Sequence, residues 1–139
     1  MDGLLSLVIP VYNEAESLGP LVDEIDEGLA AHEGPYEIVF VDDGSGDRSF
    51  EVMQGLVEKR DDVRVVRLRR NFGKATALSH GFAAARGDII VTMDGDRQDD
   101  PAEIPSLMAP LSRGYDLVSG WKQRRQDPLN KTLPSRFFN

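Results

Sequence analysis

Residues Ile89 to Pro101 read IIVTMDGDRQDDP, and the character of this stretch changes abruptly at Met93. The apolar run that ends there predicts a strand covered on both faces. Four aspartates follow within seven residues: Asp94, Asp96, Asp99 and Asp100. Like charges this close repel one another, so a stable fold needs something to offset them. A bound cation is the natural candidate.

Similar apolar runs alternate with helical patterns along the chain. The predicted strands cover residues 5–11, 36–41, 63–68, 88–93 and 115–119, and the predicted helices cover residues 14–32, 50–57, 75–85 and 102–111. Asn13 is the expected N-cap of the first helix, and Pro105 and Pro110 should shorten or kink the last. This alternation predicts an α/β fold in one domain, a Rossmann-like, mostly parallel sheet flanked by helices.

Composition excludes several classes of protein. The chain has 139 residues, of which 40% are hydrophobic and 29% are charged, as expected for one globular domain. No apolar stretch reaches the roughly 18 residues of a membrane span, and no signal peptide opens the chain, so a cytoplasmic location is expected. Because cysteine is absent, disulfides, thiolate metal sites and a cysteine nucleophile are excluded.

The net charge of −8 argues against nucleic acid as a partner, but the charge is unevenly spread. Residues 121–139 carry a net charge of +4, which leaves −12 on the rest of the chain. A basic end on an acidic body predicts a local anionic partner, although a solvated terminus explains it equally well. We therefore divide the chain into a core of residues 1–120 and a basic segment of residues 121–139.

Polar clusters follow four of the predicted strands. They cover residues 11–14, 42–45, 69–74 and 94–96. In an open α/β sheet, ligands bind beyond the carboxyl ends of the strands, and parallel strands bring these ends to one edge. One such cluster is ordinary turn chemistry, whereas four together predict a binding site.

The Asp94-Gly95-Asp96 motif indicates a divalent metal. Two carboxylates one residue apart can turn toward one ion, and hard oxygen ligands suit Mg²⁺ or Mn²⁺, which often take phosphate oxygens from a substrate as well. The alternative is a polar turn that caps the next helix, and we prefer it for Asp99 and Asp100, with Pro101 at the first helical position. The chain has neither G-x-G-x-x-G after its first strand nor a P-loop, so a metal would have to hold any phosphates.

The other polar clusters each allow two interpretations. Asp42 and Asp43 are either turn formers or acceptors of hydrogen bonds from a base or ribose. Tyr12 is either a core aromatic residue or a stacking surface for a base. The basic loop of residues 69–74, which ends at Lys74, is either solvated or complementary to a diphosphate.

Four segments together resemble family 2 glycosyltransferases. They are SLVIPVYNEAESL, EIVFVDDGSGDRS, RNFGKATALSHGFAAARGDIIVTMDGDRQDDPAEIP and YDLVSGWKQRRQDPLNKTLPSRFFN. The greatest similarity is to the group of this family that acts on polyprenyl phosphates and is similar to dolichol-phosphate-mannose synthase. The resemblance covers nearly the whole chain. The resemblance implies a GT-A fold, a nucleotide-sugar donor, a polyprenyl-phosphate acceptor and inversion at the anomeric carbon.

The resemblance also implies roles for individual residues on the donor side. Nucleotide contacts are expected from Pro10, Tyr12, Glu14, Asp42, Asp43, Lys74, Asp94, Gly95 and Asp96. Asp94 and Asp96 would bind Mg²⁺ or Mn²⁺ and the diphosphate, with Gln98 close to the metal.

On the acceptor side, relatives usually carry Gly-x-Arg after the fifth strand, whereas this chain has Gly120-Trp121-Lys122. Lys122 would replace the phosphate-binding arginine as a point charge, with Arg124 or Arg125 in support. Arg136 matches a position that contacts the acceptor phosphate. Asp94, Asp96, Lys122 and Arg136 are therefore the expected catalytic residues.

The implied reaction takes place at a membrane surface. The metal would offset negative charge on the leaving nucleoside diphosphate, and an anionic lipid phosphate can attack without a strong general base. The basic segment could also meet an anionic membrane, at the cytoplasmic face in the full-length protein.

Family members continue well beyond residue 139, which implies a fragment or the catalytic part of a longer protein. The alternatives are transfer to a saccharide hydroxyl, which needs a carboxylate base, and a non-catalytic nucleotide-sugar-binding domain.

Overall fold

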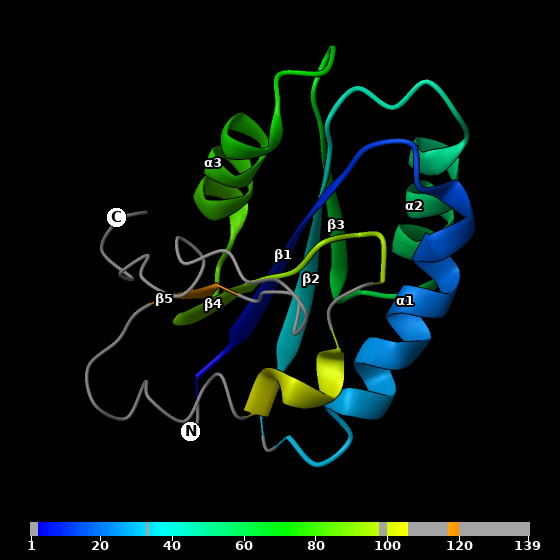
Figure 1. The fold of residues 1–139 in the computed structure, drawn as a ribbon. Coiled ribbons are helices and arrows are strands. Elements are labelled where there is room, and N and C mark those ends of the chain that lie inside the picture. The colour runs from blue at the N-terminus through cyan, green and yellow to red at the C-terminus, as the bar shows by residue number, and fades with distance from the viewer. Residues whose placement is uncertain (1–2, 33, 98–99, 106–116, 120–139) are drawn as a thin grey trace.

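The computed structural model describes residues 3–32, 34–97, 100–105 and 117–119 (Figure 1). Along the chain the elements are β1 (Leu5–Val11), α1 (Ala15–Gly28), β2 (Tyr36–Asp42), α2 (Ser49–Lys59), β3 (Val63–Arg67), α3 (Lys74–Ala84), β4 (Ile89–Thr92), the 3-10 helix η1 (Pro101–Glu103) and β5 (Leu117–Ser119). The five strands form one sheet in the order β3-β2-β1-β4-β5, and every neighbouring pair is parallel. The predicted α/β fold with a parallel sheet is confirmed.

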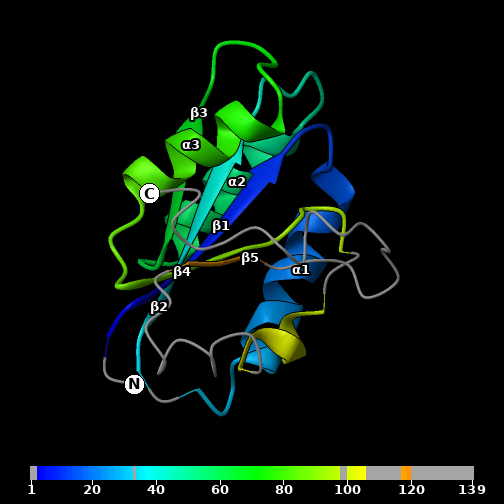
Figure 2. The ribbon, with the colours of Figure 1, turned by 60° about the vertical axis from the view of Figure 1, so that its left-hand side comes forward.

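Helices cover both faces of this sheet. Figures 1 and 2 show α1 and α2 on one face and α3 on the other. Alternate residues of β1 serve the two sides: Leu5, Leu7 and Ile9 belong to the large core that includes α1 and α2, whereas Val8 packs with Leu78 of α3. Because both faces are buried, β1 has an almost unbroken apolar sequence.

The start and end of α1 differ from the prediction. The helix ends at Gly28 rather than at His32, and a turn of residues 29–31 follows it. Gly34, with a φ of 127°, and Pro35 then lead the chain into β2. Glu14, not Asn13, is the N-cap residue of α1, and the Glu14 side chain makes no capping hydrogen bond. The prediction for Asn13 was wrong because its φ of 54° places it in the left-handed region, where its side chain bonds another loop.

The segment after β4 begins as predicted. Asp100 is the N-cap of η1, where its Oδ1 accepts a hydrogen bond of 3.0 Å from the backbone N–H of Ala102, and Pro101 is the first residue of the turn. Residues 106–111 of the predicted fourth helix, and the boundary proposed between residues 120 and 121, lie outside the described residues. Among the residues that are described, no helix has the length and apolar character needed to cross a membrane.

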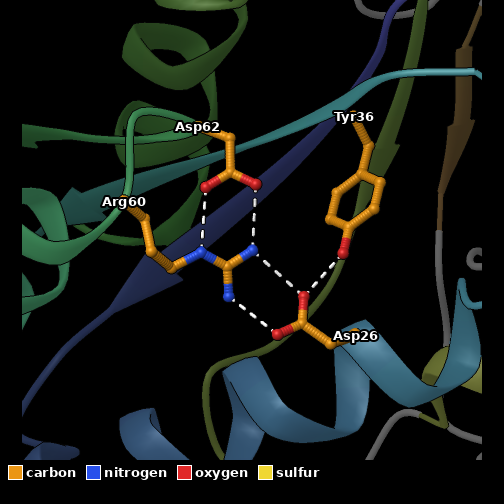
Figure 3. Close-up of polar contacts among 4 residues, drawn as sticks. All are labelled: Asp26, Tyr36, Arg60 and Asp62. Atoms are coloured by element: carbon orange, nitrogen blue, oxygen red, sulfur yellow. Dashed lines mark hydrogen bonds and ion pairs between the residues drawn. The ribbon is translucent and has the colours of Figure 1, made fainter.

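A charged cluster ties α1 to the amino-terminal ends of β2 and β3 (Figure 3). Arg60 donates to both carboxylate oxygens of Asp62 at 2.9 Å and to those of Asp26 at 2.8 and 3.0 Å. The Tyr36 hydroxyl donates to Asp26 at 2.5 Å. Burial alone would raise the pKa of Asp26, but the hydrogen bonds from Arg60 and Tyr36 bring it below its usual value. Because Tyr36 begins β2, this cluster lies at the sheet edge opposite the polar loops and is structural.

Candidate active site

The loops that follow β1, β2, β3 and β4 meet around one cavity of about 320 Å³ at the carboxyl edge of the sheet. Its lining consists of Pro10, Val11, Tyr12, Glu14, Asp43, Asn71, Gly73, Lys74, Asp94, Gly95 and Asp96. The structure therefore brings together eight of the nine residues predicted to contact a nucleotide. The ninth, Asp42, does not line this cavity.

A short ion pair in the cavity joins Lys74 to Asp94. The Lys74 ammonium lies 2.6 Å from Asp94 Oδ1, and the two side chains are 55% and 18% exposed. Lys74 is the first residue of α3, directly after Gly73, whose φ of 101° lets the chain turn into the helix. The free N–H groups and the dipole of a helix start favour anions, and the ammonium adds a full positive charge. This corner of the cavity can bind a phosphate group.

Gly95 allows the Asp94-Gly95-Asp96 turn to lie against the loop after β1. A Cβ atom at this position would collide with the carboxylate of Glu14 and would lie 3.4 Å from the carbonyl oxygen of Pro10. Tyr12 leaves the same loop with about half of its side chain exposed, as a stacking residue requires and a core aromatic residue does not.

The residues of this turn fit a divalent metal in their chemistry. Asp94 and Asp96 offer hard carboxylate oxygens, and both line the cavity. Within the described ranges, no group of three or more His, Cys, Asp or Glu side chains could hold a metal ion. Mg²⁺ and similar ions are commonly bound by one or two carboxylates plus water and substrate phosphates. The pair therefore suits Mg²⁺ or Mn²⁺ together with a diphosphate, while Gln98, the third predicted ligand, lies outside the described residues.

Asp43 holds the basic loop against the end of β2. Its two carboxylate oxygens accept hydrogen bonds from the backbone N–H groups of Phe72 and Gly73, at 2.8 and 3.1 Å. Its own N–H donates to the carbonyl of Val11 at 2.8 Å, and its side chain is buried. Asp43 thus fixes the start of α3 and with it Lys74. Its contact with a nucleoside stays a prediction.

Asp42 is wholly buried beside a second hollow of about 330 Å³ at the edge of the sheet. Its Oδ1 accepts a hydrogen bond of 3.0 Å from the N–H of Ser45, and its Oδ2 lies 3.9 Å from Arg67 Nε. Gly44, Ser45, Arg67, Leu68 and Arg69 line the hollow. The hydrogen bond to Ser45 makes Asp42 a turn residue, which is one of the two roles that the sequence suggested for it. Its contact with a base or ribose stays a prediction.

Polar residues that the sequence interpretation missed join the loops after β1 and β2. Asn13 Oδ1 accepts hydrogen bonds from the N–H groups of Gly46 and Asp47, at 2.7 and 3.2 Å. In return, Ser49 Oγ accepts a hydrogen bond of 2.8 Å from the N–H of Glu14. The Asp47 carboxylate also accepts a hydrogen bond of 3.3 Å from the N–H of Ala15, so Ser49 and Asp47 together supply the acceptors at the start of α1. With Asn13, they tie the loop that carries Tyr12 and Glu14 to the loop after β2. No local pattern signals such contacts, because the partners are more than 30 positions apart.

The model of the family named glycosyl transferase family 2 matches residues 6–138. The chain belongs to glycosyltransferase family 2. This membership confirms the resemblance found in the sequence and assigns the chain to a family of glycosyl transferases.

Curated relatives of this family 2 chain include two transferases that act on polyprenyl phosphates by name. It is 41% identical over 136 residues to undecaprenyl-phosphate 4-deoxy-4-formamido-L-arabinose transferase of Pseudomonas fluorescens, a match that covers 97% of this chain and 40% of the relative. It is 42% identical over 132 residues to dodecaprenyl-phosphate galacturonate synthase of Rhizobium johnstonii, with 90% and 38% covered. The chain spans about two fifths of the length of these relatives. Its predicted similarity to the polyprenyl-phosphate group is confirmed.

Solved structures of GT-A glycosyltransferases share the fold of this family 2 chain. A mannosyltransferase from Pyrobaculum calidifontis in complex with GDP-Man and Mn²⁺ has a TM-score of 0.61 at 29% identity, over 69% of this chain and 28% of that one. Glucosyl-3-phosphoglycerate synthase from Mycobacterium tuberculosis, in complex with Mn²⁺, UDP and its product, has a TM-score of 0.62 at 28% identity, over 78% and 39%. The predicted GT-A fold is confirmed.

Proposed function

We propose that this chain is the donor-binding region of an inverting, metal-dependent glycosyltransferase, which moves a sugar from a UDP- or GDP-sugar to a polyprenyl phosphate. The names of the relatives support the acceptor. The nucleotides and Mn²⁺ in the complexes of two solved structures support the donor and the metal. The chain spans about two fifths of its relatives, so the activity of the whole protein is part of the proposal.

The observation that carries the proposal is the meeting of Asp94, Asp96 and Lys74 in one cavity at the carboxyl edge of the sheet. A nucleoside diphosphate with a divalent ion needs both kinds of group, carboxylates for the cation and a positive charge for phosphate oxygens. Tyr12, exposed at the rim, offers a surface for the base.

In the proposed reaction, an oxygen of the acceptor phosphate forms a bond to the anomeric carbon from the side opposite the leaving group. The bond between this carbon and the diphosphate breaks, and the nucleoside diphosphate leaves with the electron pair. When bound, Mg²⁺ or Mn²⁺ would offset the negative charge that builds up on the diphosphate. Lys74 would hold a phosphate oxygen beside the metal ligands, and no proton has to be removed from an acceptor that is already an anion.

The acceptor side of the proposal rests on residues outside the described ranges. Lys122, Arg124, Arg125 and Arg136 stay the predicted contacts of the lipid phosphate. A lipid-linked acceptor would place the reaction at a membrane surface, and we propose its cytoplasmic face.

The donor side can be tested by titrating the 139-residue chain with UDP and with GDP, each with and without Mn²⁺. We expect one nucleotide to bind only when Mn²⁺ is present, because its diphosphate completes the ligands of the metal. Replacing Asp96 with alanine should weaken this binding at least about tenfold, since it removes one of two carboxylates. The matched control is Asp61→Ala, which removes an exposed acid from the turn between α2 and β3.

Metal-dependent binding that is lost in Asp96→Ala and kept in Asp61→Ala would support the donor site and identify the base. Binding of neither nucleotide by the wild-type chain, or equal binding by the two variants, would contradict the proposal.

A further inference from the structure

The backbone of Arg97 has an unfavourable conformation directly beside the proposed metal ligands. Its φ is 66°, in the left-handed region that bulky side chains rarely adopt. In the part of the chain that the structure describes, Asn13 is the only other non-glycine residue with a positive φ, and it lies in the loop after β1 at the same cavity. Such conformations persist where surrounding contacts hold them, and they are common at functional sites.

The contact that holds Arg97 comes from α1. Arg97 Nε and Nη2 both donate to Glu24 Oε2, at 2.9 and 2.7 Å. The side chains of Arg97 and Glu24 are 43% and 31% exposed, so the pair should add little to the stability of the whole fold. It does, however, tie the residue after Asp96 to a helix that is packed into the core.

The same segment also approaches α1 closely on either side of Arg97. Gly95 packs against Glu14, at the start of α1. A Cβ atom at Gly28, the last residue of α1, would lie 2.6 Å from the carbonyl carbon of Pro101. Figure 1 shows the segment after β4 running toward α1, with η1 beside the end of that helix. The Arg97–Glu24 pair therefore lies between two points where the segment is already fixed to α1.

We propose that Arg97 and Glu24 are positioning residues, whose ion pair keeps the turn of residues 94–97 in the conformation that presents Asp96 to the cavity. The proposal rests on the proposed function, which assigns Asp96 to a divalent metal. Neither Arg97 nor Glu24 lines the cavity, so both act through Asp96. When the pair is broken, the strained backbone of Arg97 relaxes and Asp96 spends less time in its binding orientation.

A purely electrostatic effect would give a different result. Arg97 adds a positive charge close to the metal ligands, and Glu24 adds a negative charge. If the two acted only through their charges, Arg97→Ala would raise the affinity for a divalent cation and Glu24→Ala would lower it. If they act as a pair, both variants lower the affinity by a similar factor, and the double variant loses no more than either single variant.

The experiment measures the affinity for Mn²⁺ in the presence of a saturating concentration of whichever nucleotide, UDP or GDP, the wild type binds. Free Mn²⁺ is followed by its electron paramagnetic resonance signal. We expect Arg97→Ala, Glu24→Ala and the double variant each to bind Mn²⁺ about threefold to tenfold more weakly than the wild type. Arg97→Lys keeps a charged donor and should recover part of the affinity.

The control variants are Arg48→Ala and Glu51→Ala, which break another exposed Arg–Glu pair, of 3.2 Å, at the start of α2, and neither residue lines the cavity. They should stay within about twofold of the wild type. Denaturant unfolding of every variant shows whether a loss of affinity occurs in a folded protein.

Opposite shifts for Arg97→Ala and Glu24→Ala, or losses that add in the double variant, would overturn the positioning role and leave the proposed function intact. A wild-type chain without Mn²⁺-dependent nucleotide binding would instead overturn the proposed function, and the positioning role with it. The positioning role would be established by equal, non-additive losses of Mn²⁺ affinity with an unchanged unfolding midpoint, together with partial recovery of the affinity in Arg97→Lys.

Discussion

Replacing Gly44 with alanine is expected to lower the free energy of unfolding by about 2–5 kcal/mol and to abolish nucleotide binding. Gly44 has a φ of 75°, which costs free energy for any residue with a Cβ atom. That atom would also lie within 3.0 Å of three backbone atoms of Arg70 and Asn71. Because backbone atoms cannot swing aside as a side-chain end can, the loop after β3 must move away from β2. Lys74 follows that loop directly, so the phosphate corner of the cavity would be displaced.

Urea unfolding and nucleotide titration of Gly44→Ala test this expectation. The matched control is Gly55→Ala in α2, where a Cβ atom would meet nothing within 4 Å. Alanine is the better helix former there, so this variant should be more stable than the wild type by about 0.5–1 kcal/mol and bind nucleotide normally. If Gly44→Ala proved as stable as the wild type, the loops after β2 and β3 could not be packed as closely as the structure shows.

The strands were predictable from the sequence because their signal is local. Runs such as residues 5–11 and 89–92 are apolar, are rich in β-branched residues and end at polar turns. Every predicted strand is found, and each described strand starts and ends within two residues of its predicted bounds. The parallel sheet follows from the alternation of strands with helices, and the parallel sheet in turn brings the polar loops to one edge.

The contacts that set the geometry of the site were not predictable, because they join residues far apart in the chain. Asn13 is a residue type that commonly caps helices, yet its amide oxygen accepts a hydrogen bond from the loop after β2. Asp43 is a residue type expected in a turn or in contact with a nucleoside, yet its carboxylate accepts two hydrogen bonds from the loop after β3. A short polar side chain satisfies whichever N–H groups the fold brings near it, and that choice depends on tertiary structure.

Glu37 illustrates the same limit inside a predicted strand. It stands in the apolar run of β2, and its side chain is buried. One carboxylate oxygen accepts hydrogen bonds from the Ser6 hydroxyl and the Arg86 N–H, at 2.5 and 2.8 Å. The other accepts from Arg64 Nε and Nη2, at 3.2 and 2.8 Å. This one side chain joins β1, β2, β3 and the turn before β4, which the sequence pattern does not show.

Replacing Glu37 with alanine is expected to cost about 2–4 kcal/mol of unfolding free energy, because it removes the acceptor of the buried Ser6 hydroxyl and of the Arg86 N–H. It also leaves the half-buried Arg64 guanidinium with the carbonyl of Ala84 as an acceptor but without its partner charge. Glu58→Ala removes an exposed acid from α2 and should change stability by less than about 0.5 kcal/mol. Urea unfolding at neutral pH measures both variants. A loss below about 1 kcal/mol in a folded Glu37→Ala protein would contradict the network.

The network also predicts how stability depends on pH. Burial alone would raise the pKa of Glu37, but the hydrogen bonds from Ser6, Arg86 and Arg64 bring it below its usual value. A carboxyl group with a lower pKa in the folded chain stabilises the fold fully above its unfolded pKa, about 4.3 for glutamate, and loses this effect as the pH falls through its folded pKa. Glu37→Gln cannot titrate, so its deficit in stability relative to the wild type should be largest near pH 7 and shrink below about pH 4. A deficit that stayed constant from pH 7 to pH 3 would mean that the Glu37 carboxylate adds nothing as a charged acceptor.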